Sequence, residues 1–378
     1  VRAVADGALM RGILPPGDAL NALTVGATHD DRLGHIDVPS TVWDITDPGA
    51  PAHYGSTGPG VGRSVKPDIY HSGGRALYTR PVLGSDQGDV SIKLAPTAAH
   101  GPGLQVAAPG RGGATDNTVF TIGTSNATAL VSREASRLFD LLESGTFGSE
   151  DAALPDGQYH PLLVRALLAH ASSWGDWDAM LRRELGLNSQ DARRRLTALL
   201  GYGRLDTDRL GTAATNCAVV LAGGHIARDE RHTYELPLPP SLRARAEWHR
   251  FTITLAYSAP TVGQLGRYRG AKVYFATPDT SLAGADRTDA EHNAVRRGSL
   301  QHEVVQGTRA MVFGDADAFP IHVECMDDAQ RLRAGKTVRY ALAVSIETAE
   351  QTSATIHDEV RARLREQARG RVRGRTQG

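Results

Sequence analysis

The stretch that most constrains the fold is residues 119–142, where a short apolar run, a glycine and a long helical pattern follow one another. Residues 119–122 predict a β-strand, and Gly123 allows the backbone to turn tightly after it. Over residues 125–142 apolar side chains recur three and four positions apart, the spacing of a helix with one buried face. The pattern predicts a strand–turn–helix unit of an α/β domain, with Ser125 at the start of the helix.

Ser125 has two interpretations on the residues alone. The free N–H groups and the dipole at a helix N-terminus favour negative charge, so a serine oxygen there can attack a carbonyl while the helix start helps to hold the oxyanion. The simpler interpretation is that Thr124 or Ser125 only caps the helix, because serine and threonine are common N-caps. The surrounding motifs decide in favour of the nucleophile.

The size and charge of the chain exclude some classes of protein. It has 378 residues, 40% of them hydrophobic and 22% charged, with a formal net charge of zero. The length gives room for one large domain and a smaller one. Zero net charge gives no reason to expect nucleic acid as a partner, and no apolar run reaches the roughly 18 residues of a membrane span. Cys217 and Cys325 do not have metal-ligand spacing and are expected to be buried thiols, with one bridge between them left open.

Several short motifs occur in an order that is typical of one enzyme family. They are Leu-Thr-Val-Gly-Ala at 23–27, Ser-Thr-Gly-Pro at 56–59, Lys-Pro-Asp-Ile at 66–69, Gly-Thr-Ser at 123–125, the helical segment 162–170 and the closing turn 201–206. Together they resemble the second half of the catalytic domain of subtilisin-like serine proteases, over about residues 20–213. That resemblance implies a parallel sheet flanked by helices, which agrees with apolar strands alternating with helical patterns at 125–142, 161–171 and 190–200.

The resemblance implies a serine endopeptidase that acts on polypeptides and needs no cofactor or metal. Ser125 would be the nucleophile that forms the acyl-enzyme, and its own backbone N–H would donate to the oxyanion. Gly123, Thr124 and Ser125 would together form the nucleophile and oxyanion turn, with Gly123 allowing close approach of the substrate backbone.

The chain departs from the family pattern in two places near this motif. The position four residues after the serine, usually proline in the family, is Ala129. The family's Ala-Pro-Gly usually follows Lys-Pro-Asp-Ile directly, but here it comes only at residues 108–110. The residues between are expected to form an inserted hairpin, with strands at 76–83 and 89–94.

The partners that a serine nucleophile needs are not found in this sequence. Relatives carry the acid and base in Asp-Thr-Gly or Asp-Ser-Gly and His-Gly-Thr, and none of these occurs here. The one His-Gly pair, at His100, is followed by proline and is expected to be a surface loop. No asparagine precedes Asn21 to supply the family's oxyanion amide.

Two explanations of this absence are open. The chain can be the C-terminal portion of a longer protease, inactive by itself, or a degenerate pseudoprotease that acts as a binding or scaffold protein. A parallel sheet that lacks its first strands exposes apolar edges, which favours the first explanation. The domain assignment is then 1–213 for an N-terminally incomplete catalytic domain, 214–350 for an accessory domain and 351–378 for a basic tail.

The accessory domain is expected to be an antiparallel β-sandwich, because six short alternating segments occur without a long helix. It is expected to stabilise the protease, with a protein or carbohydrate partner as the alternative. Acidic residues at 324 and 327–328 are interpreted as solvated charges rather than calcium ligands. The six segments are residues 233–238, 249–257, 271–276, 301–305, 321–324 and 338–346.

Five smaller features complete the prediction. Residues 356–366 have the spacing of a short amphipathic helix, and the arginines among glycines at 369–375 predict a solvated, disordered tail rather than a nucleic-acid site. His170 is expected to be a core residue rather than a ligand, and residues 29–31 (His-Asp-Asp) form a polar cluster without an assignable partner. Residues 296–308 resemble a bacterial branch of the family that often lacks export signals, which favours the cytoplasm, with secretion as the alternative.

Overall fold

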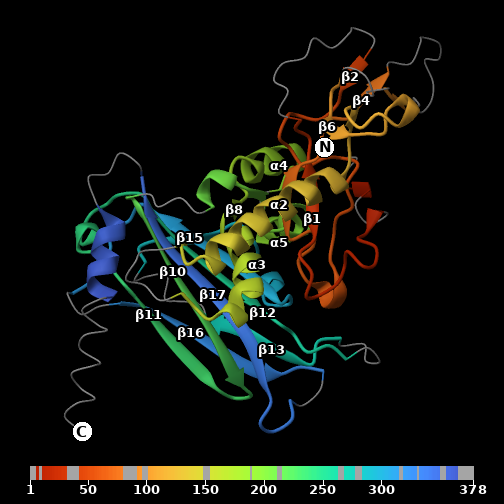
Figure 1. Ribbon diagram of the computed structural model, residues 1–378. Helices are drawn as coiled ribbons and strands as arrows, with labels where there is room; N and C mark the ends of the chain where they lie inside the picture. Colours follow the sequence, from red (N-terminus) through yellow and green to blue (C-terminus); the bar gives the residue numbers. More distant parts are fainter. Residues whose placement is uncertain are drawn as a thin grey trace.

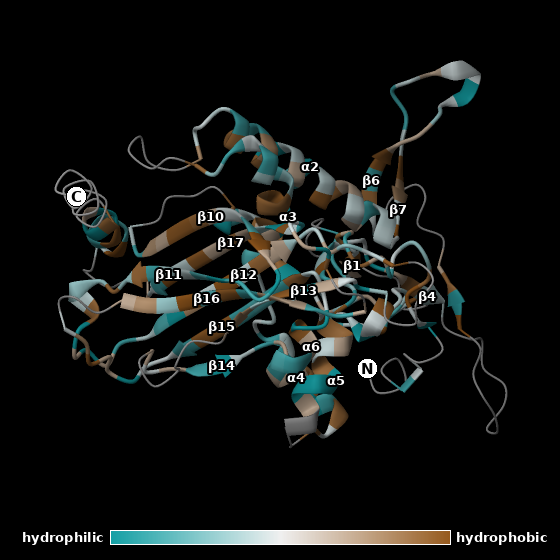
Figure 2. Cartoon of the chain, turned by 90° about the horizontal axis from the view of Figure 1, so that it is seen from below, coloured by the Kyte–Doolittle hydropathy of each residue, from teal (hydrophilic) through white to brown (hydrophobic). Residues whose placement is uncertain are grey.

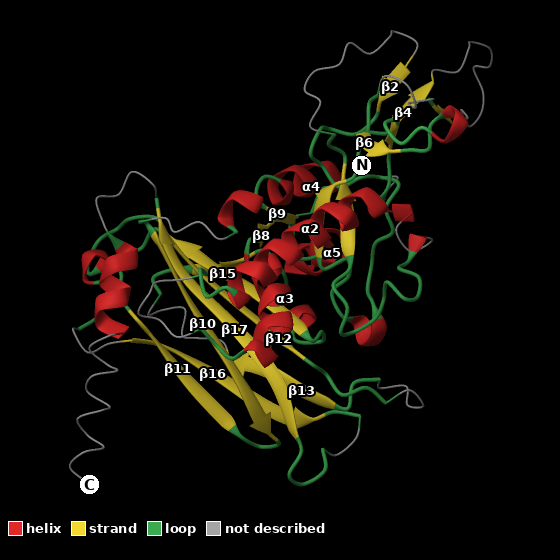
Figure 3. Ribbon diagram, viewed as in Figure 1, coloured by secondary structure: helices red, strands yellow, loops and turns green. Residues whose placement is uncertain are grey.

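The computed structural model places strands and helices of the first half beside a strand-rich second half (Figures 1 and 3). All structural statements below refer to the residues that the structure describes. These are residues 6–7, 11–31, 42–79, 92–95, 101–147, 154–187, 190–210, 215–262, 268–276, 283–314, 318–329, 332–349 and 355–364.

The first half contains a four-stranded sheet in the order β1-β3-β9-β8. Strands β1, β3 and β9 run parallel, and β8 is antiparallel to β9. The strand predicted at residues 21–27 is confirmed, although it begins four residues later, and within the described chain it forms the outer edge of this sheet. The bounds are β1 Val25–Thr28, β3 Ile69–Ser72, β8 Ser172–Ser173 and β9 Arg204–Leu205.

Four helices of eight or more residues lie in the first half. The three that were predicted are confirmed nearly to the residue, and α4 was not predicted. Gly201 follows α5 directly and has φ +55°, and a side chain there would meet the Pro67 carbonyl at 2.1 Å. The bounds are α2 Thr124–Glu143, α3 His160–His170, α4 Trp177–Leu185 and α5 Gln190–Leu200.

The inserted hairpin is present where the structure describes it. Leu77–Thr79 (β4) pairs antiparallel with Lys93–Leu94 (β5), while residues 80–91 lie outside the description. Val42–Asp44 (β2) pairs with the other edge of β4, so the stretch 28–62 contains a strand and is not loop throughout.

The strand before the nucleophile motif belongs to a separate hairpin. Thr118–Thr121 (β7) pairs with Leu104–Ala107 (β6), and this hairpin projects from the body of the molecule (Figure 2). The strand itself was predicted from its apolar run; its partner was not.

The second half consists mainly of two antiparallel sheets, in the orders β10-β17-β12-β15-β14 and β11-β16-β13. A single hydrophobic cluster joins their facing sides. All six predicted strands are confirmed, and β10 and β14 are additional. The bounds are β10 Cys217–Ala227, β11 Arg231–Pro237, β12 His249–Tyr257, β13 Ala271–Ala276, β14 Asp286–Thr288, β15 Leu300–Gly307, β16 Ala318–Asp327 and β17 Thr337–Thr348.

The five-stranded sheet is buried on both faces. Successive side chains of a strand point to opposite faces. On β17, Ala341 and Ala343 belong to the cluster around α3, while Leu342 and Val344 belong to the cluster between the two sheets. Helix α3 therefore packs directly on this sheet and joins the two halves of the molecule (Figure 1).

The remaining elements are short. The helix predicted at 356–366 is confirmed over residues 356–364, and Ile356 and Val360 bury its apolar face against the second half. The basic tail from residue 365 onward lies outside the description. Among the described helices none is long and apolar enough to cross a membrane. The short elements are α6 His292–Val295, η2 Val61–Arg63, η3 Arg111–Gly113, η4 Gly157–Tyr159, η5 Thr207–Arg209 and η6 Pro240–Leu242.

Candidate active site

The turn that carries Ser125 is fastened to the carboxyl end of β3. Gly123 precedes α2 with φ 156° and ψ 159°, a backbone region that is essentially restricted to glycine. Its N–H donates to the carbonyl of Gly73 at 2.9 Å, and its carbonyl accepts from the N–H of Asn126 at 3.2 Å. The start of α2 is thereby held at a fixed place beside the parallel sheet.

The side chain of Asn126 holds the same turn from its other side. Its Nδ2 donates to the carbonyl of Thr121 at 3.1 Å and to that of Gly73 at 3.4 Å. Its Oδ1 accepts from Thr121 Oγ1 at 3.2 Å. One amide thus links the end of β7, the end of β3 and the first turn of α2. The sequence analysis did not assign Asn126 a role; its position directly after the serine was the available signal.

The packing behind the turn leaves no room for side chains at two glycines. A Cβ at Gly73 would lie 2.4 Å from Ala27 Cβ and 2.7 Å from the hydroxyl of Tyr54. Gly74 has φ 98°, and a Cβ there would lie 2.9 Å from the Thr121 carbonyl. The Tyr54 hydroxyl donates to the carbonyl of Gly74 at 2.8 Å, and burial raises the pKa of Tyr54, which keeps it a donor.

Ser125 is exposed, whereas Ala127 two residues later is fully buried. Its side chain forms no hydrogen bond with any other residue of the described chain, so it is not the local cap that the simpler interpretation required. Its backbone N–H lies in the first turn, where a helix provides no acceptor of its own. Within the part of the chain that the structure describes, Ser125 is therefore an exposed hydroxyl without a partner, at the first turn of a helix whose start is firmly held.

The other two residues of the predicted turn are placed with it. Gly123 supplies the special backbone conformation, and the Thr124 carbonyl accepts from Thr128 Oγ1 at 2.9 Å. Helix α2 continues unbroken through Ala129, the position where the family usually has proline. No histidine or carboxylate of the described chain is bonded to Ser125, and His100 lies outside the description.

Residues 29–31 have partners that the sequence analysis did not find. His29 Nε2 lies 2.6 Å from Asp44 Oδ1, and Arg75 Nε donates to Asp31 Oδ2 at 3.0 Å. Asp30 Oδ2 accepts from Arg204 Nη2 at 2.8 Å. These contacts fasten the loop after β1 to the insertion and to β9, so the cluster has a structural explanation.

Charge and burial within this network shift two pKa values. Burial pushes the pKa of Asp44 upward, but the hydrogen bond and charge of His29, with Arg75 nearby, outweigh it and lower that pKa. His53 is held between Thr46 Oγ1 and the Tyr78 hydroxyl, at 2.7 and 2.6 Å. Burial, reinforced by the charges of His29 and Arg11, lowers the pKa of His53 to about 4.

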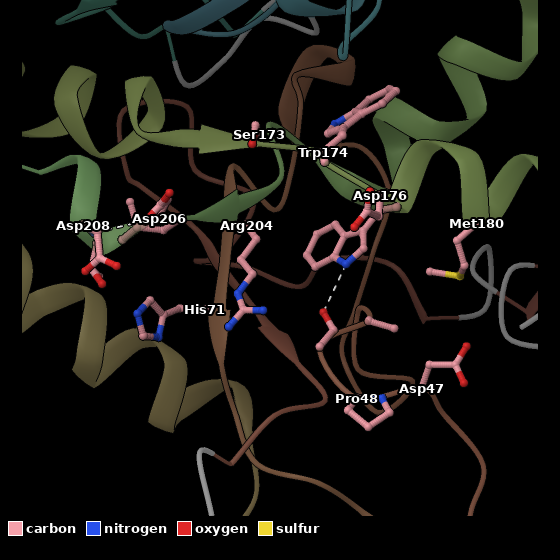
Figure 4. Close-up of a pocket in the computed structure, with 16 residues that line it drawn as sticks. Asp47, Pro48, His71, Ser173, Trp174, Asp176, Met180, Arg204, Asp206 and Asp208 are labelled. Atoms are coloured by element: carbon pink, nitrogen blue, oxygen red, sulfur yellow. Dashed lines mark hydrogen bonds between the residues drawn. The ribbon is translucent and has the colours of Figure 1, made fainter. Parts of the chain in front are cut away.

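An acidic cavity of about 780 Å³ lies beside strands β3 and β9 (Figure 4). Its wall includes His71 from β3, Arg204 from β9 and the indole of Trp177, whose Nε1 donates to the Gly49 carbonyl at 3.1 Å. His71 is 4% exposed and accepts the Ser72 N–H at Nδ1. Four aspartates line the cavity: Asp47, Asp176, Asp206 and Asp208.

Other residues singled out in the sequence have structural roles. His170 is buried, and both ring nitrogens are hydrogen-bonded to hydroxyls, as expected of a core residue. Cys217 and Cys325 are free thiols, of which Cys325 is buried and Cys217 partly exposed. Glu324 and Asp328 are each paired with an arginine, at 2.5 and 2.6 Å. No group of three or more candidate metal ligands is found among the described residues.

Comparison with known proteins identifies the family of the chain. A model of the subtilase family (Peptidase_S8) matches residues 9–203, which include the turn, strands β1, β3 and β8 of the sheet and helices α2 to α5. The match covers more than half of the chain, and the chain belongs to the subtilase family.

Two further similarities are more distant. The chain is 24% identical over 271 residues to the protein y4bN of Sinorhizobium fredii, covering 70% of this chain and 54% of y4bN. It thus spans about half the length of that relative. It also resembles the tripod from the baseplate of bacteriophage Tuc2009 over 37% of this chain and 49% of that one, with 8% identity and a TM-score of 0.19, which is too slight to define the fold.

Proposed function

We propose that Ser125 is the acyl-forming nucleophile of a serine endopeptidase in the intact protein, and that this chain by itself does not hydrolyse peptides. One observation carries the proposal: an exposed serine without a structural partner among the described residues stands on a turn that Gly73, Gly123 and Asn126 hold rigidly, inside the region that matches the family. Pre-organised placement of this kind is what nucleophilic catalysis requires.

The chemistry follows from the position of the serine. Ser125 Oγ attacks the scissile carbonyl of a polypeptide and gives its proton to a histidine base, which passes it to the leaving amine. The N–H of Ser125 and the start of α2 stabilise the oxyanion. Water then hydrolyses the acyl-enzyme, and no cofactor takes part.

We propose that residues outside this chain supply the acid, the base and the oxyanion amide. The sequence contains neither of the two family motifs for acid and base, and no described histidine or carboxylate is bonded to Ser125. The outer edge of β1 is where further parallel strands of a subtilisin-like sheet would join. The histidine and aspartate carried by those strands would then be brought beside the turn.

The domain arrangement that fits best is an incomplete subtilisin-like domain at 1–213, a β-sandwich at 214–350 and a basic tail at 351–378. We propose that the sandwich mainly stabilises the catalytic part, because α3 packs on its five-stranded sheet and both ring nitrogens of His170 are hydrogen-bonded to hydroxyls of that sheet. A protein partner on the outer surface of the sandwich remains compatible with this role.

Labelling with a fluorophosphonate probe tests the assignment. The longest natural polypeptide that contains these residues should be labelled and should cleave a casein substrate, and the Ser125→Ala variant should do neither. Loss of a triad member costs about 10⁴ to 10⁶ in rate, so the contrast should be large. Labelling that survives Ser125→Ala would overturn the assignment of the nucleophile.

Two controls separate the parts of the proposal. The 378-residue chain alone should remain unlabelled; strong labelling of it would show that the base lies within this chain. A folded longer protein that is neither labelled nor active would instead support a pseudoprotease that serves as a scaffold.

A further inference from the structure

A second cavity, of about 470 Å³, lies at the other end of β3 and is strongly basic. It is bounded by residues 59–66, by α5 and by the turn after α6. Five of its eleven lining residues are cationic and none is acidic: Arg63, Lys66, Arg194, Arg195 and Arg297. The volume lies within the range of about 300–1,000 Å³ that small-molecule sites occupy.

The positive charge of this cavity is only partly compensated. Lys66 is neutralised by Asp68, with 2.6 Å between Nζ and Oδ2, and Arg195 forms an exposed pair with Asp6. Arg63 and Arg194 are exposed, and their side chains form no hydrogen bond or ion pair with another described residue. Two guanidinium groups are therefore available at the mouth of the cavity.

A buried hydroxyl provides an independent indication of a ligand. Ser64 lines the cavity and is 1% exposed, yet its Oγ has no hydrogen-bond partner among the described residues. A buried hydroxyl without a partner is unfavourable because it has lost its hydrogen bonds to water, and most buried polar groups in native proteins are hydrogen-bonded. The neighbouring hydroxyl of Thr197, by contrast, is used twice, donating to the Arg193 carbonyl and accepting from the Glu291 N–H.

We propose that this cavity binds an organic phosphate of about the size of a nucleotide. Guanidinium groups recognise phosphate through paired, charge-assisted hydrogen bonds, which suits Arg63 and Arg194. Ser64 Oγ can donate to a phosphate oxygen that enters the cavity. The apolar part of the wall, including Val65 and Ala294, suits the uncharged part of such a molecule.

The position of the cavity gives binding a structural consequence. Residues 59–66 and α5 belong to the region that matches the family, whereas Ala294 and Arg297 belong to the second half. A ligand held by both would link the two halves and stabilise the folded chain by mass action. None of the lining residues belongs to the Ser125 turn, so the inference is independent of the proposed proteolysis.

Calorimetric titration of the 378-residue chain with ATP and with inorganic tripolyphosphate, at low ionic strength, tests the proposal. Both probes should bind, ATP more tightly because it also fills the apolar part. The double variant Arg63→Gln/Arg194→Gln should weaken ATP binding at least about tenfold, since it removes two charged donors to the phosphates. The matched control Arg309→Gln, an exposed arginine paired with Asp286 on the second half, should leave affinity within about twofold.

The Ser64→Ala variant sharpens the test. It removes a hydroxyl that is unsatisfied without ligand, so the Tm of the free chain should stay the same or rise. Affinity for ATP should nevertheless fall about three- to tenfold, because a donor to the phosphate is lost. Reduced thermal stability together with unchanged affinity would contradict the assigned role of Ser64.

Three results would overturn the proposal. One is the absence of heat from either probe at millimolar concentration. Another is equal loss of affinity in the double variant and in Arg309→Gln, which would mean non-specific attraction of anions. The third is a poly-glutamate peptide that binds more tightly than ATP and loses affinity in the double variant, which would identify an acidic polypeptide as the ligand.

Discussion

The turn that carries Ser125 and the junction where α3 packs on the five-stranded sheet both contain polar side chains. These side chains differ in how fully they are hydrogen-bonded. At the junction, His170 Nδ1 lies 2.9 Å from Thr254 Oγ1 and its Nε2 lies 2.8 Å from Ser345 Oγ. Arg165, also buried, donates to Ser299 Oγ at 2.9 Å. At the turn, Ser125 is exposed and its hydroxyl has no partner among the described residues.

This difference separates polar residues that stabilise the fold from the proposed nucleophile. A buried polar group must be hydrogen-bonded if the fold is to be stable, and His170 meets that condition at both ring nitrogens, with Thr254 and Ser345 lying 84 and 175 residues away in sequence. Ser125 contributes nothing comparable to the fold, although the residues around it are held tightly. A rigid turn that presents a reactive group without using it structurally is expected of a catalytic site.

The largest expected effect comes from disturbing the rigid turn itself. Gly123→Ala forces a side chain into a backbone region that only glycine adopts readily, so the Ser125 hydroxyl should shift. Labelling of the intact protein by a fluorophosphonate should fall at least about a hundredfold, since misplacement by about 1 Å has that cost. The matched control is Gly145→Ala, at φ 69° just beyond α2, which should lower stability without slowing labelling. Equal loss of labelling in both variants would show that the backbone conformation of Gly123 has no specific role in placing Ser125.

The next effect should appear at the junction. His170→Leu leaves the Thr254 and Ser345 hydroxyls without their shared partner, so the free energy of unfolding should fall by about 2 kcal/mol. Urea denaturation measures this directly, and the rate of labelling of the folded intact protein should not change. His225→Leu, at an exposed position, should alter stability by less than about 0.5 kcal/mol. A catalytic defect in folded His170→Leu would contradict the structural role.

The smallest expected effect is a loss of stability in acid. Burial lowers the pKa of His302 to about 3 and that of His53 to about 4, from an ordinary 6.5. Because both are neutral when folded, their stabilising contribution is complete above pH 6.5 and is lost as pH falls toward their folded pKa values. At pH 5.5 the fully buried His302 alone should cost about 1.4 kcal/mol. His302→Asn should weaken the dependence of the free energy of unfolding on pH, as measured by urea denaturation. An unchanged dependence on pH would show that His302 is not the source of the acid sensitivity.

The sequence predicted elements whose pattern is local and missed those defined by distant contacts. Strands β12 and β13 were predicted to the residue, because alternation and flanking turns mark them. Strand β10 was missed since Gly223 and Gly224 interrupt its pattern. Those glycines make room for aromatic rings: a Cβ would lie 2.6 Å from Tyr159 and 2.8 Å from Tyr340.

The same distinction applies to the candidate site. The motif Gly-Thr-Ser indicated the turn because backbone geometry is encoded locally. The partners of Asp30 and Asp31 were out of reach, since Arg204 and Arg75 lie 174 and 44 residues further along the chain. The cavity containing Ser64 could not be predicted either, because its wall joins segments from both halves.

Site mapping of the fluorophosphonate adduct tests the central claim most directly. Trypsin releases residues 112–133 as one peptide, which contains Ser125 and also Ser132. Fragmentation of that peptide from the labelled intact protein should place the whole adduct on Ser125, and the Ser125→Ala protein should yield the peptide unmodified. An adduct on Ser132 or on any other peptide would contradict the assignment of Ser125 as the nucleophile.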